Sequence, residues 1–264
     1  MHPYAYQLSR LPWLWAIKEG SKPPYIGDVN DNSGAYQELF SLAAEKIGHQ
    51  LKIIRLPKKR IYLQLAAGQI DFYPSSGFSP ERSEYLYWLS NGFVTKSALL
   101  STHTDQEITD INTAKGKLLV PLGSSAANYV KENPNIEAQK MGILPIDTAI
   151  LALRLGRGNF YIYDIDTLDY YLKRKKLRSF EELSLRLHPN AIEKEFSSLY
   201  SAFSIHSDYF TPEANPDYDK GKESGYNNQR IRPSKDCLAH AFEQALKELQ
   251  QAGITDRIYN KYFK

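Results

Sequence analysis

Apolar residues in the first third of the chain follow two different spacings. Over 35–47 they recur three and four positions apart, which is the spacing of one helix face. Short apolar runs over 11–17, 51–56 and 70–72 have the length of strands, and a second helical pattern fills 58–67 behind Pro57. Strands that alternate with helices through short links predict a mostly parallel sheet with right-handed crossovers.

The same order returns in the second half of the chain. Strands are predicted over 117–122 and 160–163, and helices from after Ala126 to about Lys131, over 146–155 and from about 167 to 175. A strand over 199–205, a helix over 238–249 capped by Asp236, and a short last helix over 255–262 follow. Residues 206–234 are polar and contain proline, glycine and asparagine, which predicts an exposed, partly mobile loop. The sequence therefore predicts two α/β units.

A short polar loop follows the predicted strand that ends at Phe72. Ser79 suits the N-cap of a helical turn that Pro80 opens, and Arg82 falls inside that turn. Backbone N–H groups, hydroxyls and a guanidinium in one arc are suited to a small carboxylate. A surface turn with a solvated arginine is the alternative interpretation.

Two further features have both a structural and a functional interpretation. Gly123, Ser124 and Ser125 precede a predicted helix, where they form a second anion-binding arc or an ordinary N-cap. Trp13 and Trp15 share one face of the first strand, where they pack in the core or one indole floors a pocket.

Composition narrows the class of protein. The chain has 264 residues and a net charge of +3, which gives no strong attraction to nucleic acid or anionic lipid. Its single cysteine, Cys237, excludes an intrachain disulfide and a multi-cysteine metal site, and the histidines lack metal-ligand spacing. Neither a membrane-spanning run, a Gly-x-Ser-x-Gly elbow nor a phosphate loop is present. We expect no cofactor, no metal and no nucleic-acid partner.

Three ordered motifs resemble one protein family. They are 65–71 followed by 75–82, then Gly123 to Ser125 with Tyr129 and 156–159 leading to Asp164, and finally the ending over 241–263. This set is similar to the extracytoplasmic solute-binding proteins typified by polar amino-acid receptors of ABC transporters. Each motif alone is weak, but together they span nearly the whole chain in the family's order.

The resemblance implies a fold and a function. The fold would be the two-lobed α/β periplasmic-binding-protein fold of type II, with lobe one over 1–96 plus 203–264, lobe two over 97–202, and two hinge strands. The protein would be a monomeric periplasmic receptor, not an enzyme, whose signal peptide has been removed. It would capture a small zwitterion or carboxylate between the lobes, most simply an amino acid, for the membrane permease of an ABC transporter.

The resemblance also implies roles for individual residues. Arg82 would pair with the ligand's α-carboxylate, helped by the backbone at Ser75 and Gly77. The helix start at Ser124 and Ser125 would hold the same carboxylate from the other lobe. Asp164 would accept the α-ammonium.

The chain departs from the family in three places: about Lys58, near the end of the first strand, where Glu19 is the only candidate for the family's acidic residue, and over 206–234, which is longer than the family usually shows. The family often has an aromatic residue about where Lys58 stands, so positive charge lies near the expected cleft. Either the ligand carries extra negative charge, or Lys58 is the solvated start of a helix. Trp15, Tyr25 or Phe78 could supply the missing aromatic wall.

Two other classes of protein stay open. An enzyme similar to cyclohexadienyl dehydratase would use Glu19, Asp164 or Glu195 as an acid near Arg82. A ligand-sensing domain of a membrane receptor would have the same two lobes.

Overall fold

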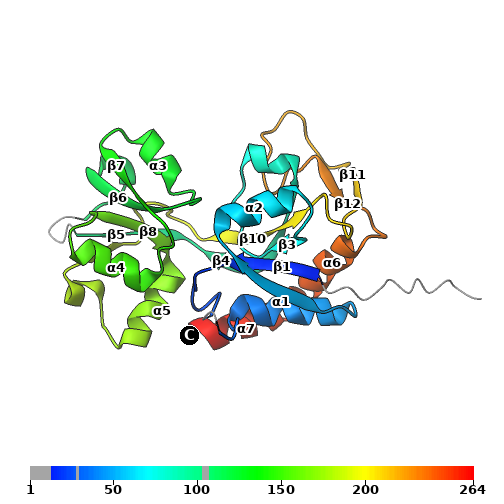
Figure 1. Ribbon diagram of the computed structural model, residues 1–264, viewed down its shortest axis with the longest axis horizontal. Helices are drawn as coiled ribbons and strands as arrows, with labels where there is room; N and C mark the ends of the chain where they lie inside the picture. Colours follow the sequence, from blue (N-terminus) through cyan, green and yellow to red (C-terminus); the bar gives the residue numbers. More distant parts are fainter. Residues whose placement is uncertain (1–12, 28–29, 103–106) are drawn as a thin grey trace, which may run out of the picture.

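The computed structural model describes residues 13–27, 30–102 and 107–264, and it has two α/β lobes side by side (Figure 1). Each lobe contains a five-stranded sheet, with order β2-β1-β3-β10-β4 in the first and β7-β6-β8-β5-β9 in the second. Strand β1 runs parallel to β2 and β3, and β6 runs parallel to β7 and β8. The predicted two-lobed α/β fold is confirmed.

The first lobe is built from both ends of the chain. Its elements are β1 (Trp13–Lys18), α1 (Ala35–Lys46), β2 (Leu51–Leu56), α2 (Lys58–Ala66), β3 (Phe72–Tyr73), the 3-10 helix η1 (Pro80–Glu84), β4 (Leu86–Thr95), β10 (Ser197–Ser204), α6 (Leu238–Gln251) and α7 (Ile254–Phe263). The first two positions of the predicted first strand, Leu11 and Pro12, lie outside the described residues. The other predicted helices and strands of this lobe are confirmed to within about two residues.

The middle of the chain forms the second lobe. Its elements are β5 (Ser97–Ser101), η2 (Ile111–Thr113), β6 (Gly116–Pro121), α3 (Ala127–Glu132), β7 (Ile136–Met141), α4 (Ile146–Arg154), β8 (Phe160–Asp164), α5 (Ile165–Lys175), η3 (Phe180–Leu183) and β9 (Arg186–His188). The sequence pattern did not reveal β7, an edge strand whose central residues are mostly exposed.

Successive residues of a strand belong to hydrophobic clusters on opposite faces of its sheet, because their side chains point to opposite faces. Trp15 and Ile17 of β1 pack with α1 and α6, whereas Ala16 packs with α2 on the other face. In the second lobe Leu119 of β6 packs with α4 and α5, and Leu118 packs with α3 and η2. Within the described part of the chain, no helix is long and apolar enough to cross a membrane.

The chain crosses between the lobes twice. Lys96 alone separates β4 from β5, and the return passes from β9 to β10. Ser197 of β10 pairs with Thr95 and Ser201 pairs with Leu89, so β10 belongs to the first sheet from its first residue. Residues 197–202 therefore lie in the sheet of the first lobe, which differs from the predicted boundary at 202.

A buried carboxylate joins the two lobes near the first crossing. Asp166 of α5 accepts hydrogen bonds from the hydroxyls of Tyr25 (3.3 Å), Thr95 (2.5 Å) and Tyr259 (2.8 Å). Tyr25 and Tyr259 come from opposite ends of the chain, and Asp166 is only 8% exposed. Three hydroxyl donors satisfy a carboxylate that burial would otherwise disfavour.

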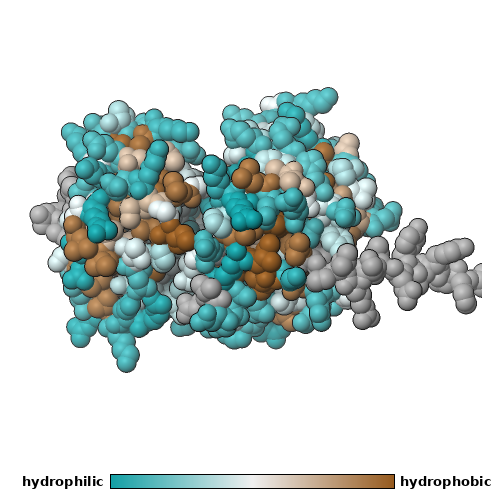
Figure 2. Space-filling view, in the orientation of Figure 1, coloured by the Kyte–Doolittle hydropathy of each residue, from teal (hydrophilic) through white to brown (hydrophobic). Residues whose placement is uncertain are grey.

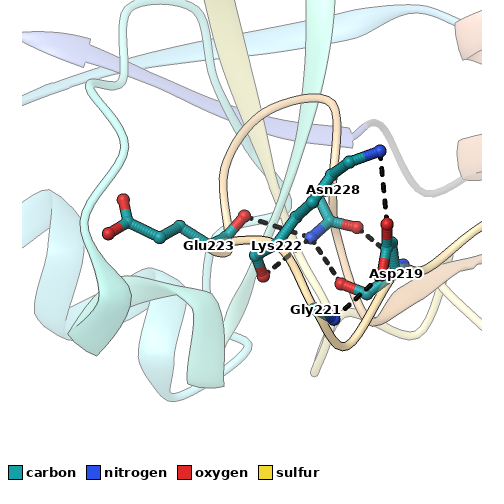
Figure 3. A network of polar contacts seen from close by, with 5 residues as sticks. All are labelled: Asp219, Gly221, Lys222, Glu223 and Asn228. Carbon is teal, nitrogen blue, oxygen red and sulfur yellow. Dashed lines mark hydrogen bonds and ion pairs between the residues drawn. The ribbon is translucent and has the colours of Figure 1, made fainter.

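Segment 206–234 is held by hydrogen bonds rather than left as an open loop. It contains the two-stranded hairpin of β11 (Pro212–Ala214) and β12 (Ile231–Pro233). The Asn228 amide nitrogen donates to the carbonyls of Asp219 (3.0 Å), Lys222 (3.2 Å) and Glu223 (3.0 Å), while its oxygen accepts from the Asp219 N–H at 2.9 Å (Figure 3). One buried carboxamide thus closes this turn.

The same segment covers the edge of the first sheet. The Gln229 carboxamide accepts from the Trp88 N–H and donates to the Trp88 carbonyl, both at 2.8 Å, as a neighbouring strand would. Tyr226 stacks on Tyr200 with ring centroids 3.5 Å apart, and its hydroxyl accepts from the Phe78 N–H at 2.7 Å. The segment therefore supports β4 and the loop that leads to Arg82.

Candidate ligand-binding site

Arg82 lies at the start of η1, as the sequence predicts. The Ser79 side chain accepts a hydrogen bond from the Arg82 N–H at 3.3 Å, which confirms the predicted N-cap. The guanidinium lies 3.9 Å from the centre of the Tyr62 ring and donates to the Gly77 carbonyl at 3.0 Å. Among the described residues no carboxylate forms an ion pair with Arg82. Its N–H groups that bond neither the Gly77 carbonyl nor the Tyr85 hydroxyl are thus available to an acceptor from outside the protein.

Lys58 opens α2 and lies beside the turn at Gly123 of the other lobe. Its methylene carbons lie 3.8 Å from the position that a Cβ on Gly123 would take, which is an ordinary van der Waals distance, so the two lobes approach each other closely here. Lys58 is half-buried, whereas Lys59 and Arg60 are exposed. The interpretation of a solvated helix start therefore fits the two neighbours but not Lys58.

The surroundings of Lys58 disfavour its charge. Burial, followed by the positive charges of Arg82 and Lys22, lowers the pKa of the Lys58 ammonium to about 8, and Asp164 acts in the opposite direction. No carboxylate of the described residues forms an ion pair with Lys58. The four charged groups are thus close enough to influence one another across the junction of the lobes.

The Asp164 carboxylate is already paired within the protein. Asp164 ends β8, and its side chain does not cap α5 but forms an ion pair with the Lys22 ammonium. The side chains of Lys22 and Asp164 are 13% and 19% exposed. No hydrogen bond from another described group reaches the paired Asp164 oxygen.

Lys22 is held in place by its own turn and by aromatic rings. Its N–H donates to the Ile26 carbonyl at 2.8 Å and its carbonyl accepts from the Ile26 N–H at 2.9 Å. The ammonium lies 5.1 Å and 5.7 Å from the ring centres of Tyr25 and Tyr163. Lys22 was not among the predicted site residues, because a lysine beside two prolines gives no local signal of a site.

The three aromatic residues named for the wall pack against neighbours within the protein. Trp15 is 1% exposed and packs edge-on against Phe40 and Phe72, which is the core-packing alternative, and the side chain of Trp13 lies outside what the structure describes. Tyr25 is fully buried and lies beneath the Lys22 ammonium, so it supports the site rather than lining it. Phe78 packs on Trp88 and Tyr226.

The small residues of the two predicted anion-binding arcs differ in exposure and in the hydrogen bonds that they already make. Ser75 is half-buried and Gly77 is exposed, with the Gly77 carbonyl already bound to Arg82. In the second lobe the Ser124 hydroxyl accepts from the Ala126 N–H at 3.2 Å, and Ser125 is exposed. Helix α3 begins at Ala127, directly after Ala126, as predicted. Ser124 therefore acts as a cap of its own turn, which is the structural alternative.

The lobes meet along an indentation on the upper side of the molecule in Figure 2, and α2 and α3 face each other across it in Figure 1. At this junction three cations, Lys22, Lys58 and Arg82, accompany the carboxylate of Asp164. No cluster of three or more metal-ligating acids, histidines or cysteines occurs in the part of the chain that is described. Fold and site together define a two-lobed solute-binding protein.

The chain belongs to family 3 of the bacterial extracellular solute-binding proteins, whose model matches residues 15–264. A comparison with curated protein sequences finds no match. Similar solved structures include an ancestral arginine-binding protein bound to arginine, with 18% identity, TM-score 0.69 and coverage of 96% of this chain and 98% of that one. At these levels of identity the structural likeness establishes the fold alone.

Two other similar structures show the range of this fold. One is an ancestral amino-acid-binding protein described as a precursor of cyclohexadienyl dehydratase, with 16% identity, TM-score 0.67 and coverage of 96% and 95% of the two chains. The other is a histidine kinase sensor domain, with 14% identity, TM-score 0.67 and coverage of 95% of each chain.

Proposed function

We propose that this protein is a periplasmic receptor that captures a small carboxylate-bearing solute between its lobes and delivers it to the permease of an ABC transporter. The observation that carries the proposal is the pair of cations at the junction, Arg82 and Lys58, neither of which has a carboxylate partner among the described residues. Arg82 offers a planar fork that matches two carboxylate oxygens. The solute would supply the negative charge that the site lacks.

Closure of the lobes would be coupled to this capture. Lys58 and Arg82 both come from the first lobe, and Lys58 lies beside the turn at Gly123 in the second, so an anion held by these two cations would lie next to the second lobe. A ligand that binds the closed form better than the open form shifts the equilibrium toward closure. We propose the same monomeric chain as the unit that a permease recognises.

The enzyme and sensor alternatives have less support from the site. An acid catalyst near Arg82 would have to be Asp164, Glu19 or Glu195 on the sequence pattern. Asp164 is ion-paired with Lys22, and the other two are exposed. The similar structures of a dehydratase precursor and a sensor domain show that the fold alone does not choose among these functions.

A thermal-shift screen tests the proposal directly. The natural chain is melted at pH 7 with each of a panel of amino acids, polyamines and small mono-, di- and tricarboxylic acids. A ligand that binds the folded protein and not the unfolded chain raises the free energy of unfolding, and therefore the melting temperature. At a concentration of one hundred times its Kd the added free energy of unfolding is about 2.7 kcal/mol. We expect a carboxylic acid or amino acid to raise it. A panel in which only polyamines, or no compound, raise the melting temperature would refute the proposal.

A further inference from the structure

We propose that the ligand is a small dicarboxylate without an amino group, because Lys22 already occupies the carboxylate that a ligand ammonium would need. This inference rests on the proposed function and names the chemical class of the ligand for that same site. It makes Lys22 the residue that determines specificity.

Arg82 and Lys58 are two neighbouring cations without a carboxylate partner among the described residues. Arg82 lies 3.9 Å from the ring centre of Tyr62 in α2, the helix that Lys58 opens, and its charge lowers the pKa of Lys58. A half-buried cation beside another is destabilised until an anion compensates it. A single carboxylate would satisfy the Arg82 fork, and the Lys58 ammonium would then remain to attract a second one. Two separated cations therefore match a ligand with two carboxylates.

A ligand ammonium would need an acidic side chain near these two cations. Among the described residues Asp164 is the only acid whose charge favours the Lys58 ammonium, so it is the acid of this cluster. Glu81 lies next to Arg82 in the chain, but it is exposed and its carboxylate is bound by Ser79. An amino acid entering the site would thus have to take Asp164 away from Lys22.

That exchange would leave Lys22 without a partner. The side chain of Lys22 is 13% exposed and lies among the rings of Tyr25 and Tyr163, so water reaches it poorly. Its free charge would repel Lys58, whose pKa it already lowers. Removing one member of a buried ion pair leaves a charge that is costly to keep. A ligand without an ammonium avoids this cost altogether.

The test compares acids that differ only in an amino group. Titration calorimetry at pH 7 measures the affinity of the natural chain for two pairs of ligands, succinate against L-aspartate and glutarate against L-glutamate. Malonate and adipate cover shorter and longer dicarboxylates. Butyrate is the monocarboxylate control. We expect the preferred dicarboxylate to bind at least about tenfold tighter than its amino counterpart, which corresponds to about 1.4 kcal/mol.

Variants at Lys22 test the cause of this preference. Lys22→Met keeps most of the length of the side chain, removes its charge and releases Asp164, so the ratio of affinities should shift by about tenfold or more toward the amino acid. Lys22→Arg keeps the charge and should keep the preference for the dicarboxylate. Lys52→Met, on an exposed position of β2, is the control and should leave the ratio unchanged.

The outcomes separate this inference from the proposed function. An amino acid that binds the natural chain more tightly than its dicarboxylate counterpart overturns the inference and leaves the proposed receptor intact. Tight binding of butyrate alone, or an unchanged ratio in Lys22→Met, also overturns it. If no acid or amino acid of either panel binds, the proposed function itself fails.

Discussion

The affinity for an anionic ligand should depend on pH through Lys58. Burial and the neighbouring cations lower the pKa of this ammonium to about 8 in the unliganded protein. A bound carboxylate favours the charged form and returns the pKa toward the ordinary value of a lysine, so binding takes up a proton wherever Lys58 is neutral beforehand. The affinity should therefore be highest below pH 8 and fall as the pH rises.

The size of the effect follows from the fraction of Lys58 that is charged. With a pKa of about 8 the ammonium form is about nine-tenths populated at pH 7 and about one-tenth at pH 9. If only this form binds the ligand, the dissociation constant should rise about tenfold between these two pH values. Titration calorimetry at pH 7, 8 and 9 measures it, and at pH 8 the heat should vary with the buffer because about half a proton is taken up.

Two variants separate Lys58 from other titrating groups. Lys58→Arg carries a charge that does not titrate in this range, so it should bind at pH 7 and lose the pH dependence. Lys58→Met should bind weakly at every pH. Equal affinities at pH 7 and 9 in the natural chain, or a pH dependence that persists in Lys58→Arg, would refute the reasoning.

Two further predictions concern stability. Asn228→Ala removes four hydrogen bonds from a buried turn and should lower the free energy of unfolding by about 2–3 kcal/mol, whereas Asn227→Ala, at the exposed neighbour, should change it by less than about 0.5 kcal/mol in denaturant titrations. Equal effects would show that the carboxamide network is not what holds the turn. Asp166 accepts three hydroxyl hydrogen bonds through its two carboxylate oxygens, and Asp166→Asn replaces one of these oxygens by an NH2 donor. The free energy of unfolding should fall by about 1–3 kcal/mol in the same measurement. An unchanged free energy of unfolding would mean that these hydroxyls find other partners.

Local signals in the sequence were enough for most of the fold. The helical spacing over 35–47 and the flanking Pro57 and Gly68 predict α1 and α2 because these patterns act within one or two turns. Caps were less predictable: α6 begins after Cys237 rather than Asp236, and α1 begins after Gly34 without a side-chain cap. The edge strand β7 has no apolar run, because its exposed residues need none.

The site was predictable only where its signals are local. The Ser79 cap and Arg82 stand in one short stretch, so the sequence alone places them in one arc. Lys22 meets Asp164 across 142 positions and two lobes, and no spacing along the chain contains that information. Trp15 illustrates the opposite limit, since strand alternation does not say which face holds the core.

The most direct test of the account is the affinity of Arg82→Ala for the tightest ligand of the screen, measured by titration calorimetry. Loss of a charge-assisted partner should cost about 2–5 kcal/mol, which is a weakening of about 30-fold to several thousand-fold. The unliganded variant should melt close to the natural chain, because the lost contacts with Tyr62 and Gly77 are offset by weaker repulsion of Lys58. Arg257→Ala, on an exposed face of α7, is the control. A variant that binds as tightly as the natural chain would contradict the central claim that Arg82 holds the ligand.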